Sequence, residues 1–242
     1  MFQSVKIAPS ILSADFMNLA RDIELIEQAG AGFVHVDVMD GHFVPNLTMG
    51  VPLVKQLKKA TALPLDVHLM IDNPETQLPW FLDAGADIVT VHVEPLDATG
   101  LLRCIEAIHA AGAKAAASVK PRTPVFALEP VIAQLDMVLV MSVEPGFSGQ
   151  RYIAGSERKV AQVAQLARAA GVSPLIEVDG GIGEATAPLV AAAGADVLVC
   201  GNAVFAAKDP AVALRAVQAA AQAAADQALS ANPSLVGAAE RA

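Results

Sequence analysis

The chain has 242 residues, of which 54% are hydrophobic and 4% aromatic, and its formal net charge is −9 at a pI of about 4.9. This length fits one α/β domain of about 250 residues. The acidic balance excludes partners that need a broad basic surface, such as nucleic acid or an anionic membrane. An anionic substrate stays compatible, because backbone N–H groups and a metal ion can create a local site.

Cysteine use and the first residues indicate a reduced, intracellular protein. Cys104 and Cys200 lie in apolar segments and are too few for a disulfide framework. The N-terminal residues contain no charged leader followed by a long apolar core, so no signal peptide is expected. Asp196 and Asp226 interrupt the Ala-rich segments that come nearest to a membrane span. We therefore expect a soluble, cytoplasmic protein.

Short apolar runs alternate with helical patterns along the chain. The phrase Ala-Gly-Ala marks four of the transitions, where glycine ends a helix in the left-handed conformation, at 29–31, 84–86, 111–113 and 193–195. Strands are expected to begin near Ile7, Phe33, Leu65, Ile88, Ala115, Met137, Leu175 and Val197. Helices are expected near 17–29, 51–58, 74–84, 100–111, 125–134, 155–170, 184–193 and 211–229.

Eight βα repeats without a linker predict a single TIM (β/α)8 barrel, a catalytic domain over residues 1–230. An open doubly wound sheet is the alternative. It usually has fewer strands and a Gly-x-Gly-x-x-Gly turn after the first, where this chain has Pro9-Ser10. The Ala-rich C-terminal stretch is broken at Asn232-Pro233. It predicts an extended last helix and a frayed tail at 231–242.

Polar side chains occupy one face of three predicted strands, because residues two apart on a strand point the same way. In the second strand these residues are His35, Asp37 and Met39, and in the third they are Asp66, His68 and Met70. The seventh strand ends in Asp179, directly before Gly180-Gly181. Active sites of these barrels lie where the strands end, so we expect His35, Asp37, His68 and Asp179 to meet there.

A divalent cation would resolve the energetic problem that this cluster poses. Carboxylates buried without a partner are strongly destabilising. Two imidazoles and two carboxylates suit Zn²⁺, Fe²⁺, Mn²⁺ or Co²⁺ better than Ca²⁺ or Mg²⁺, and the sequence does not choose among the four. Asp37 and Asp179 come from separated strands and would flank a substrate, as in moving a proton from one face of a carbon to the other.

Glycine-rich turns follow the sixth, seventh and eighth predicted strands, at 145–150, 180–183 and 201–203. Barrels of this type bind phosphate on the backbone N–H groups of the last two such turns. The sequence therefore predicts a phosphate-bearing substrate.

Five motifs together resemble the ribulose-phosphate 3-epimerase family, in order and with barrel spacing, over about residues 5–207. They are Ile7-Ala8-Pro9-Ser10-Ile11-Leu12-Ser13-Ala14-Asp15-Phe16, His35-Val36-Asp37-Val38-Met39-Asp40-Gly41-His42-Phe43-Val44-Pro45-Asn46, Leu65-Asp66-Val67-His68-Leu69-Met70, Met141-Ser142-Val143-Glu144-Pro145-Gly146-Phe147 and Glu177-Val178-Asp179-Gly180-Gly181-Ile182. The resemblance implies a metal-dependent enzyme that interconverts D-ribulose 5-phosphate and D-xylulose 5-phosphate, in the pentose phosphate pathway or the Calvin cycle. It also implies a homo-oligomer.

The resemblance assigns roles to individual positions. Asp37 and Asp179 match the acid–base pair, and with His35 and His68 they match the ligands of one divalent cation per subunit. The positions that match substrate or phosphate contacts are Ser10, His68, Gly146, Phe147, Ser148, Gly149, Gly180, Gly181, Gly201 and Asn202. Met39, Met70 and Met141 match a thioether lining around the reacting carbons.

Three departures from the family pattern stand out: Ser148 for a usual glycine, Asn202 for a usual serine, and 118–124 for a usual Asn-Pro-Ala-Thr-Pro. Ser148 could stiffen its loop, since glycine alone reaches some backbone conformations at low cost. Asn202 keeps its backbone N–H, so phosphate binding should persist. Of the other histidines, His42 is expected to pack its loop, His92 to lie beside the ligands, and His109 to lie on a helix surface.

Two other functions remain open. An allulose-6-phosphate 3-epimerase would perform the same chemistry on a six-carbon phosphosugar, although Gly180-Gly181-Ile182 favours the pentose enzyme. A catalytically silent phosphosugar-binding barrel would keep the fold and lose the reaction. The presence of both aspartates and all four candidate ligands argues against the silent barrel.

Overall fold

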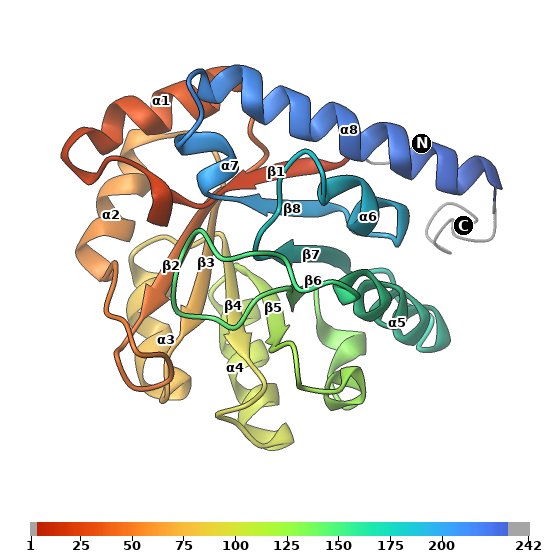
Figure 1. Cartoon of the computed structure of the whole chain (residues 1–242). Coiled ribbons are helices and arrows are strands. Elements are labelled where there is room, and N and C mark those ends of the chain that lie inside the picture. Colours follow the sequence, from red (N-terminus) through yellow and green to blue (C-terminus); the bar gives the residue numbers. More distant parts are fainter. Residues whose placement is uncertain (1–3, 232–242) are drawn as a thin grey trace.

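A computed structural model describes residues 4–231 and shows eight parallel strands curled into a barrel, with helices on the outside (Figure 1). The strands are β1 Lys6–Pro9, β2 Val34–Met39, β3 Leu65–Met70, β4 Ile88–His92, β5 Lys114–Val119, β6 Met137–Met141, β7 Leu175–Asp179 and β8 Val197–Cys200. The ladder runs β1-β8-β7-β6-β5-β4-β3-β2. Its two ends meet, because Gly32 N–H donates to Ile7 O at 2.8 Å and Ser10 bridges to His35. The predicted TIM barrel is confirmed.

The helices follow the predicted βα alternation, with one clear exception. The α-helices are α1 Leu19–Ala29, α2 Val51–Ala60, α3 Pro74–Asp83, α4 Ala98–Ala110, α5 Ser156–Ala169, α6 Ala187–Ala192, α7 Asn202–Phe205 and α8 Pro210–Ala231. The single helix predicted at 125–134 is wrong, since that segment forms two 3₁₀ helices, η3 Val125–Leu128 and η4 Ile132–Gln134. Pro130 stands between them and has no N–H to continue a helical hydrogen-bond ladder.

Two local differences concern the turns near the site. Helix α6 starts at Ala187, later than predicted, because the Thr186 hydroxyl accepts from Gly183 N–H at 3.0 Å and donates to Gly181 O at 2.9 Å. These bonds hold the preceding residues in a turn. The one-turn helix α7 was not predicted, since four residues are too few to show helical periodicity.

The strand alternation sorts side chains into an outer core and a barrel interior. Val34, Val36 and Val38 of β2 belong to the large cluster that strands form with the surrounding helices. The opposite strand faces fill the barrel, and one end of the interior is closed by a smaller apolar cluster of Ala8, Phe33, Ile88, Ala116, Met137, Val197 and Val199. Further along the strands the interior becomes polar. Such stacked layers of inward side chains are typical of this fold.

The last helix, α8 Pro210–Ala231, lies against the outside of the barrel. Helix α8 packs against α1 and α6 (Figure 1), and its last residue, Ala231, is also the first residue of the predicted tail. The rest of that tail, 232–242, lies outside the described residues. Cys104 and Cys200 are free and buried, as expected. Within residues 4–231, no helix is both long and apolar enough to span a membrane.

Candidate active site and metal centre

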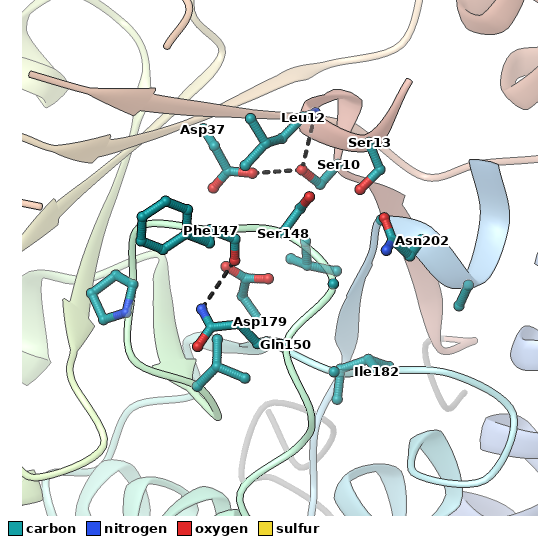
Figure 2. A pocket seen from close by; sticks show the side chains of 18 of the residues that line it. Ser10, Leu12, Ser13, Asp37, Phe147, Ser148, Gln150, Asp179, Ile182 and Asn202 are labelled. Atoms are coloured by element: carbon teal, nitrogen blue, oxygen red, sulfur yellow. Dashed lines mark hydrogen bonds between the residues drawn. The ribbon is translucent and has the colours of Figure 1, made fainter. Parts of the chain in front are cut away.

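A cavity of about 370 Å³ opens at the C-terminal ends of the strands, and residues from β2, β3, β6, β7 and β8 and from the loops beyond the strands line it (Figure 2). Nearly all the side chains and turns predicted for the site meet there. They are Ser10, Asp37, Met39, Met70, Met141, Gly146, Phe147, Ser148, Gly149, Asp179, Gly180, Gly181, Gly201 and Asn202. Neither Lys nor Arg is among the residues that line this cavity.

The two candidate ligand histidines lie beneath the cavity and do not line it. His35 and His68 are both fully buried. His35 Nε2 lies 3.4 Å from Asp37 Oδ1, and His68 Nδ1 lies 3.3 Å from the same oxygen. Each of His35, Asp37, His68 and Asp179 offers one donor atom, and these four atoms all lie within 4.8 Å of one another. The predicted four-residue cluster is therefore formed.

The expectation that all four residues end their strands is wrong for His35. His35 is the second residue of β2 and pairs with Asp66, one layer deeper than the pair Asp37 and His68. Only Asp179 is the last residue of its strand. Strands of a closed barrel are staggered, so residues at different positions along their strands reach one height. Sequence position within a strand therefore does not give depth.

The donor set fits a divalent cation. His35 Nε2 is buried and has no hydrogen-bond partner in the structure, although it faces the Asp37 carboxylate. An imidazole nitrogen left without a partner is unfavourable in a protein interior unless its lone pair meets an acceptor of electrons such as a metal ion. Two nitrogen and two carboxylate donors match the preference of Zn²⁺, Fe²⁺, Mn²⁺ and Co²⁺.

The two aspartates have opposite protonation preferences. Burial, and then the negative charge of Asp37, raise the pKa of Asp179 to about 6. Burial also acts to raise the pKa of Asp37, but the positive charge of His35 outweighs it and holds that pKa well below its usual value. Ser10 Oγ adds a hydrogen bond of 2.5 Å to Asp37 Oδ2. Figure 2 shows both carboxylates at the same cavity.

Asp66 and Glu177 are buried acidic residues beside His35 to which sequence reasoning gave no role. Asp66 Oδ2 lies 2.5 Å from His35 Nδ1, and Glu177 Oε1 lies 3.8 Å from the same nitrogen. All three side chains are fully buried. Burial, and then the charge of Asp66, raise the pKa of Glu177 well above its usual value, which favours the neutral acid form of Glu177. Asp66 and Glu177 lie two residues before His68 and Asp179, so the alternation that indicated the ligands also includes them.

Two glycines in the turns are required by the backbone. Gly181 has φ of 63°, and a Cβ there would collide with the Tyr152 backbone nitrogen. Gly149 has φ of 74°, and its Cβ would lie 2.6 Å from Asn202 Nδ2. Ser148, in contrast, avoids positive φ, as does every described non-glycine residue. The departure at Ser148 therefore imposes no backbone strain.

The remaining histidines lie as expected. His42 N–H donates to Asp40 Oδ1 at 2.8 Å within its own loop. His109 is partly exposed and pairs with Asp136 at 2.9 Å on the outside of the barrel. His92 is fully buried, and its Nε2 lies 2.9 Å from His68 Nε2.

Fold and site together define a (β/α)8-barrel enzyme with two carboxylates of unlike pKa beside a candidate metal centre. The family model described as "Ribulose-phosphate 3 epimerase family" matches residues 6–205, and the chain belongs to that family of carbohydrate isomerases. The resemblance inferred from the motifs is confirmed.

This chain aligns with several named relatives over most of their length. Ribulose-5-phosphate-3-epimerase, chloroplastic, of Arabidopsis thaliana is 48% identical over 213 residues, or 88% of this chain and 76% of the relative. Ribulose-phosphate 3-epimerase of Bacillus subtilis is 48% identical over 206 residues, or 85% and 94%. The Rhodobacter capsulatus protein of that name is 50% identical over 204 residues, or 84% and 87%.

Solved structures show the same fold at low identity. A 3-hexulose-6-phosphate synthase has a TM-score of 0.65 at 22% identity and covers 89% of this chain and 99% of its own. KGPDC from Streptococcus mutans has a TM-score of 0.70 at 13% identity and covers 91% and 99%. These similarities support the barrel architecture.

Proposed function

We propose that this protein interconverts D-ribulose 5-phosphate and D-xylulose 5-phosphate by epimerisation at C3. The observation that carries the proposal is the pair Asp37 and Asp179, which come from β2 and β7, line one cavity and have opposite pKa shifts. Epimerisation needs a base on one face of a carbon and an acid on the other. The names of the relatives supply the substrate.

The roles of the two aspartates follow from their pKa values. Asp37 stays ionised and can accept the C3 proton, whereas Asp179, whose pKa is raised to about 6, holds a proton more readily and can donate one to the opposite face. The carbanion formed between the two transfers is delocalised as an enediolate over C2 and C3. In the reverse direction the two residues exchange roles. Met39, Met70 and Met141 line the cavity and shield these groups from water.

We also propose one divalent cation per subunit, Zn²⁺, Fe²⁺, Mn²⁺ or Co²⁺, held by His35, Asp37, His68 and Asp179. The partnerless His35 Nε2 and the mutual proximity of the four donor groups support this assignment. When bound, such a cation polarises the substrate oxygens and stabilises the negative charge that develops on them. Without it, Asp37 is left facing two imidazole nitrogens at 3.3 and 3.4 Å.

The phosphate group would be bound by backbone rather than by side-chain cations. The turns after β7 and β8 present Gly180, Gly181, Gly201 and Asn202 to the cavity, which Lys and Arg do not line. Backbone N–H groups can bind an anion without a formal charge. Ser13 Oγ lies at this end of the cavity without a hydrogen-bond partner and offers one more donor. The turn over the cavity, Gly146, Phe147, Ser148 and Gly149, and also Ser10 would contact the sugar. The sugar contact predicted for His68 has no support from the cavity lining, which His68 does not join.

Turnover of three substrates by one purified sample tests the proposed function. D-Ribulose 5-phosphate should have the highest kcat/KM, above allulose 6-phosphate. Free D-ribulose should lose at least about 10²-fold, because binding energy of the remote phosphate contributes to the transition state. A preference for allulose 6-phosphate would favour the hexose enzyme, and no turnover of either phosphosugar would favour a silent binding barrel. Equal kcat/KM for ribulose and its phosphate would contradict a phosphate site.

Two variants locate the phosphate site in the same assay. Gly181→Val should raise KM strongly, because a side chain at φ of 63° is strained and collides with the Tyr152 backbone. Asn202→Ser should have a small effect, since it keeps the backbone N–H.

Cytoplasmic location, a homo-oligomeric state and the pathway remain predictions. The A. thaliana relative is named as a chloroplastic protein.

A further inference from the structure

A chain of hydrogen-bonded side chains leads away from His68 on the side opposite the proposed metal site. His68 Nδ1 faces Asp37, and His68 Nε2 lies 2.9 Å from His92 Nε2. His92 Nδ1 in turn lies 2.9 Å from Glu94 Oε2. Both histidines are fully buried, and the Glu94 side chain is 20% exposed. The chain thus connects the candidate ligand to a carboxylate near the surface.

Counting the protons fixes the direction of these hydrogen bonds. An ionised carboxylate only accepts, so His92 Nδ1 must carry the proton donated to Glu94. His92 is fully buried and faces one carboxylate and one imidazole, so its ring carries a single N–H. His92 Nε2 is then an acceptor, and His68 must donate its Nε2–H to it. His68 Nδ1 is left as a lone pair beside Asp37, as a metal ligand needs to be.

We propose that His92 and Glu94 are positioning residues that hold His68 in the form able to bind the cation. This inference rests on the proposed metal site, and it gives His68 the same support that Asp66 gives His35 directly at 2.5 Å. Carboxylates behind ligand histidines fix the protonated nitrogen and raise the basicity of the other. If the proton order were reversed, His68 would donate from Nδ1 to Asp37, and that nitrogen could not bind a cation.

Glu94 is itself fixed, and by the segment that departs from the family pattern. Its Oε1 accepts from Lys120 N–H at 2.7 Å and from Thr123 Oγ at 2.5 Å. Lys159 Nζ braces the same segment through the carbonyls of Lys120, Pro121 and Thr123, each at 2.7 Å. Burial acts to raise the pKa of Glu94, but the hydrogen bonds from His92 and this segment lower it to about 2. Glu94 is therefore a carboxylate at neutral pH.

Because Glu94 Oε1 already accepts two hydrogen bonds, the orientation of the amide in Glu94→Gln can be predicted. Lys120 N–H and Thr123 Oγ both need an acceptor, so the glutamine carbonyl should take the place of Oε1. The amide NH₂ would then face His92 Nδ1 and donate to it. This reverses every hydrogen bond of the chain and puts a proton on His68 Nδ1. The substitution changes neither the size of the side chain nor its hold on the segment.

Two measurements test the proposal. Competition of metal-free protein with a chelator for Zn²⁺ should give a Kd about 10- to 100-fold higher for Glu94→Gln than for the unsubstituted protein. With ¹⁵N-labelled histidine, NMR should show the His92 proton on Nδ1 in the zinc-saturated unsubstituted protein, and on Nε2 in metal-free Glu94→Gln. The matched control is Glu157→Gln, because Glu157 Oε2 likewise accepts from a hydroxyl, of Tyr152 at 2.7 Å, and from the backbone N–H of Gly155 at 3.1 Å. Its Zn²⁺ affinity should equal that of the unsubstituted protein.

The outcomes separate this inference from the metal site on which it rests. An unsubstituted protein that binds no Zn²⁺ would overturn both. Tight Zn²⁺ binding that Glu94→Gln leaves unchanged would overturn the positioning role alone. Should Glu94→Gln fail to fold, the NMR spectrum of the unsubstituted zinc-loaded protein still decides, since a His92 proton on Nε2 contradicts the proposed order.

Discussion

Replacing either Asp37 or Asp179 by asparagine should lower kcat for epimerisation of ribulose 5-phosphate by about 10²- to 10⁴-fold, the usual contribution of a general acid or base. Asparagine keeps the size and one oxygen of the side chain but cannot carry a proton between substrate and enzyme. The reaction needs both residues, because the proton leaves one face of C3 and returns to the other. Rates should be measured at saturating metal, so that a change in metal affinity does not contribute.

The matched control for these variants is Asp196→Asn. Burial raises the pKa of Asp196 to about 6, as it does for Asp179, but Asp196 precedes β8 at the opposite end of the barrel. There its carboxylate accepts from Ile176 N–H at 2.9 Å. Asp196→Asn should leave kcat unchanged, which shows that a raised carboxyl pKa alone does not mark a catalytic residue.

The single variants should also differ from each other in heavy water. A protein that lacks only one aspartate can still exchange the C3 hydrogen of the epimer whose hydrogen faces the remaining base. Proton NMR of each separate epimer should therefore show exchange in one of the two and none in the other, with Asp37→Asn and Asp179→Asn giving opposite patterns. Near-normal epimerisation by either variant with metal bound would contradict the two-base assignment and indicate a single mobile base.

Removing the cation should abolish turnover, and adding back Zn²⁺, Fe²⁺, Mn²⁺ or Co²⁺ should restore it. The reason is that the charge on the substrate oxygens loses its main stabilisation. His68→Ala should weaken Zn²⁺ binding by more than the roughly 10- to 100-fold that loss of a ligand's hydrogen-bond partner costs. His109→Ala is the control, because His109 pairs with Asp136 outside the barrel. Full activity in protein shown by elemental analysis to be metal-free would contradict the assignment.

The affinity for the cation should rise with pH. Burial acts to lower the pKa of His35, but the charges of Asp66 and Asp37 outweigh it and raise that pKa well above its usual value. The pKa of Asp179 is raised to about 6, first by burial. A cation must displace these protons, so its Kd should fall about tenfold per pH unit for each group while the pH lies below that group's pKa. Asp179 contributes up to about pH 6, and His35 continues to contribute above it. Calorimetry in buffers of different ionisation enthalpy counts the protons, and a pH-independent Kd would contradict the ligand set.

The fold could be predicted from sequence because its periodicities are simple. Strands buried on both faces, such as β2 and β3, alternate apolar residues that face the helices with residues that face the barrel interior. Glycine ends helices such as α1. The prediction failed where periodicity is interrupted, at Pro130, and where an element is a single turn, at α7. The first failure involves no site residue, whereas α7 begins at the predicted phosphate contact Asn202.

The ligand cluster could be predicted because its members occupy inward-facing, period-two positions of β2, β3 and β7. Sequence alone did not predict how deep each ligand lies in the barrel or which residues of neighbouring strands it contacts. The register places His35 beside Asp66 and Asp37 beside His68, and this depends on the stagger of the closed barrel. The pairing of His68 with His92 and Glu94 depends on the side-by-side packing of β3 and β4 and on the loop that holds Glu94. Such contacts join residues from separate segments, and no local pattern reports them.

The most direct test of the central claim follows the C3 hydrogen of ribulose 5-phosphate during turnover by the metal-loaded protein in heavy water. If Asp37 and Asp179 exchange their protons with solvent between turnovers, proton NMR should show xylulose 5-phosphate formed with deuterium at C3. Xylulose 5-phosphate that retains the original hydrogen at C3, or no xylulose 5-phosphate at all, would contradict epimerisation by proton transfer through these two residues.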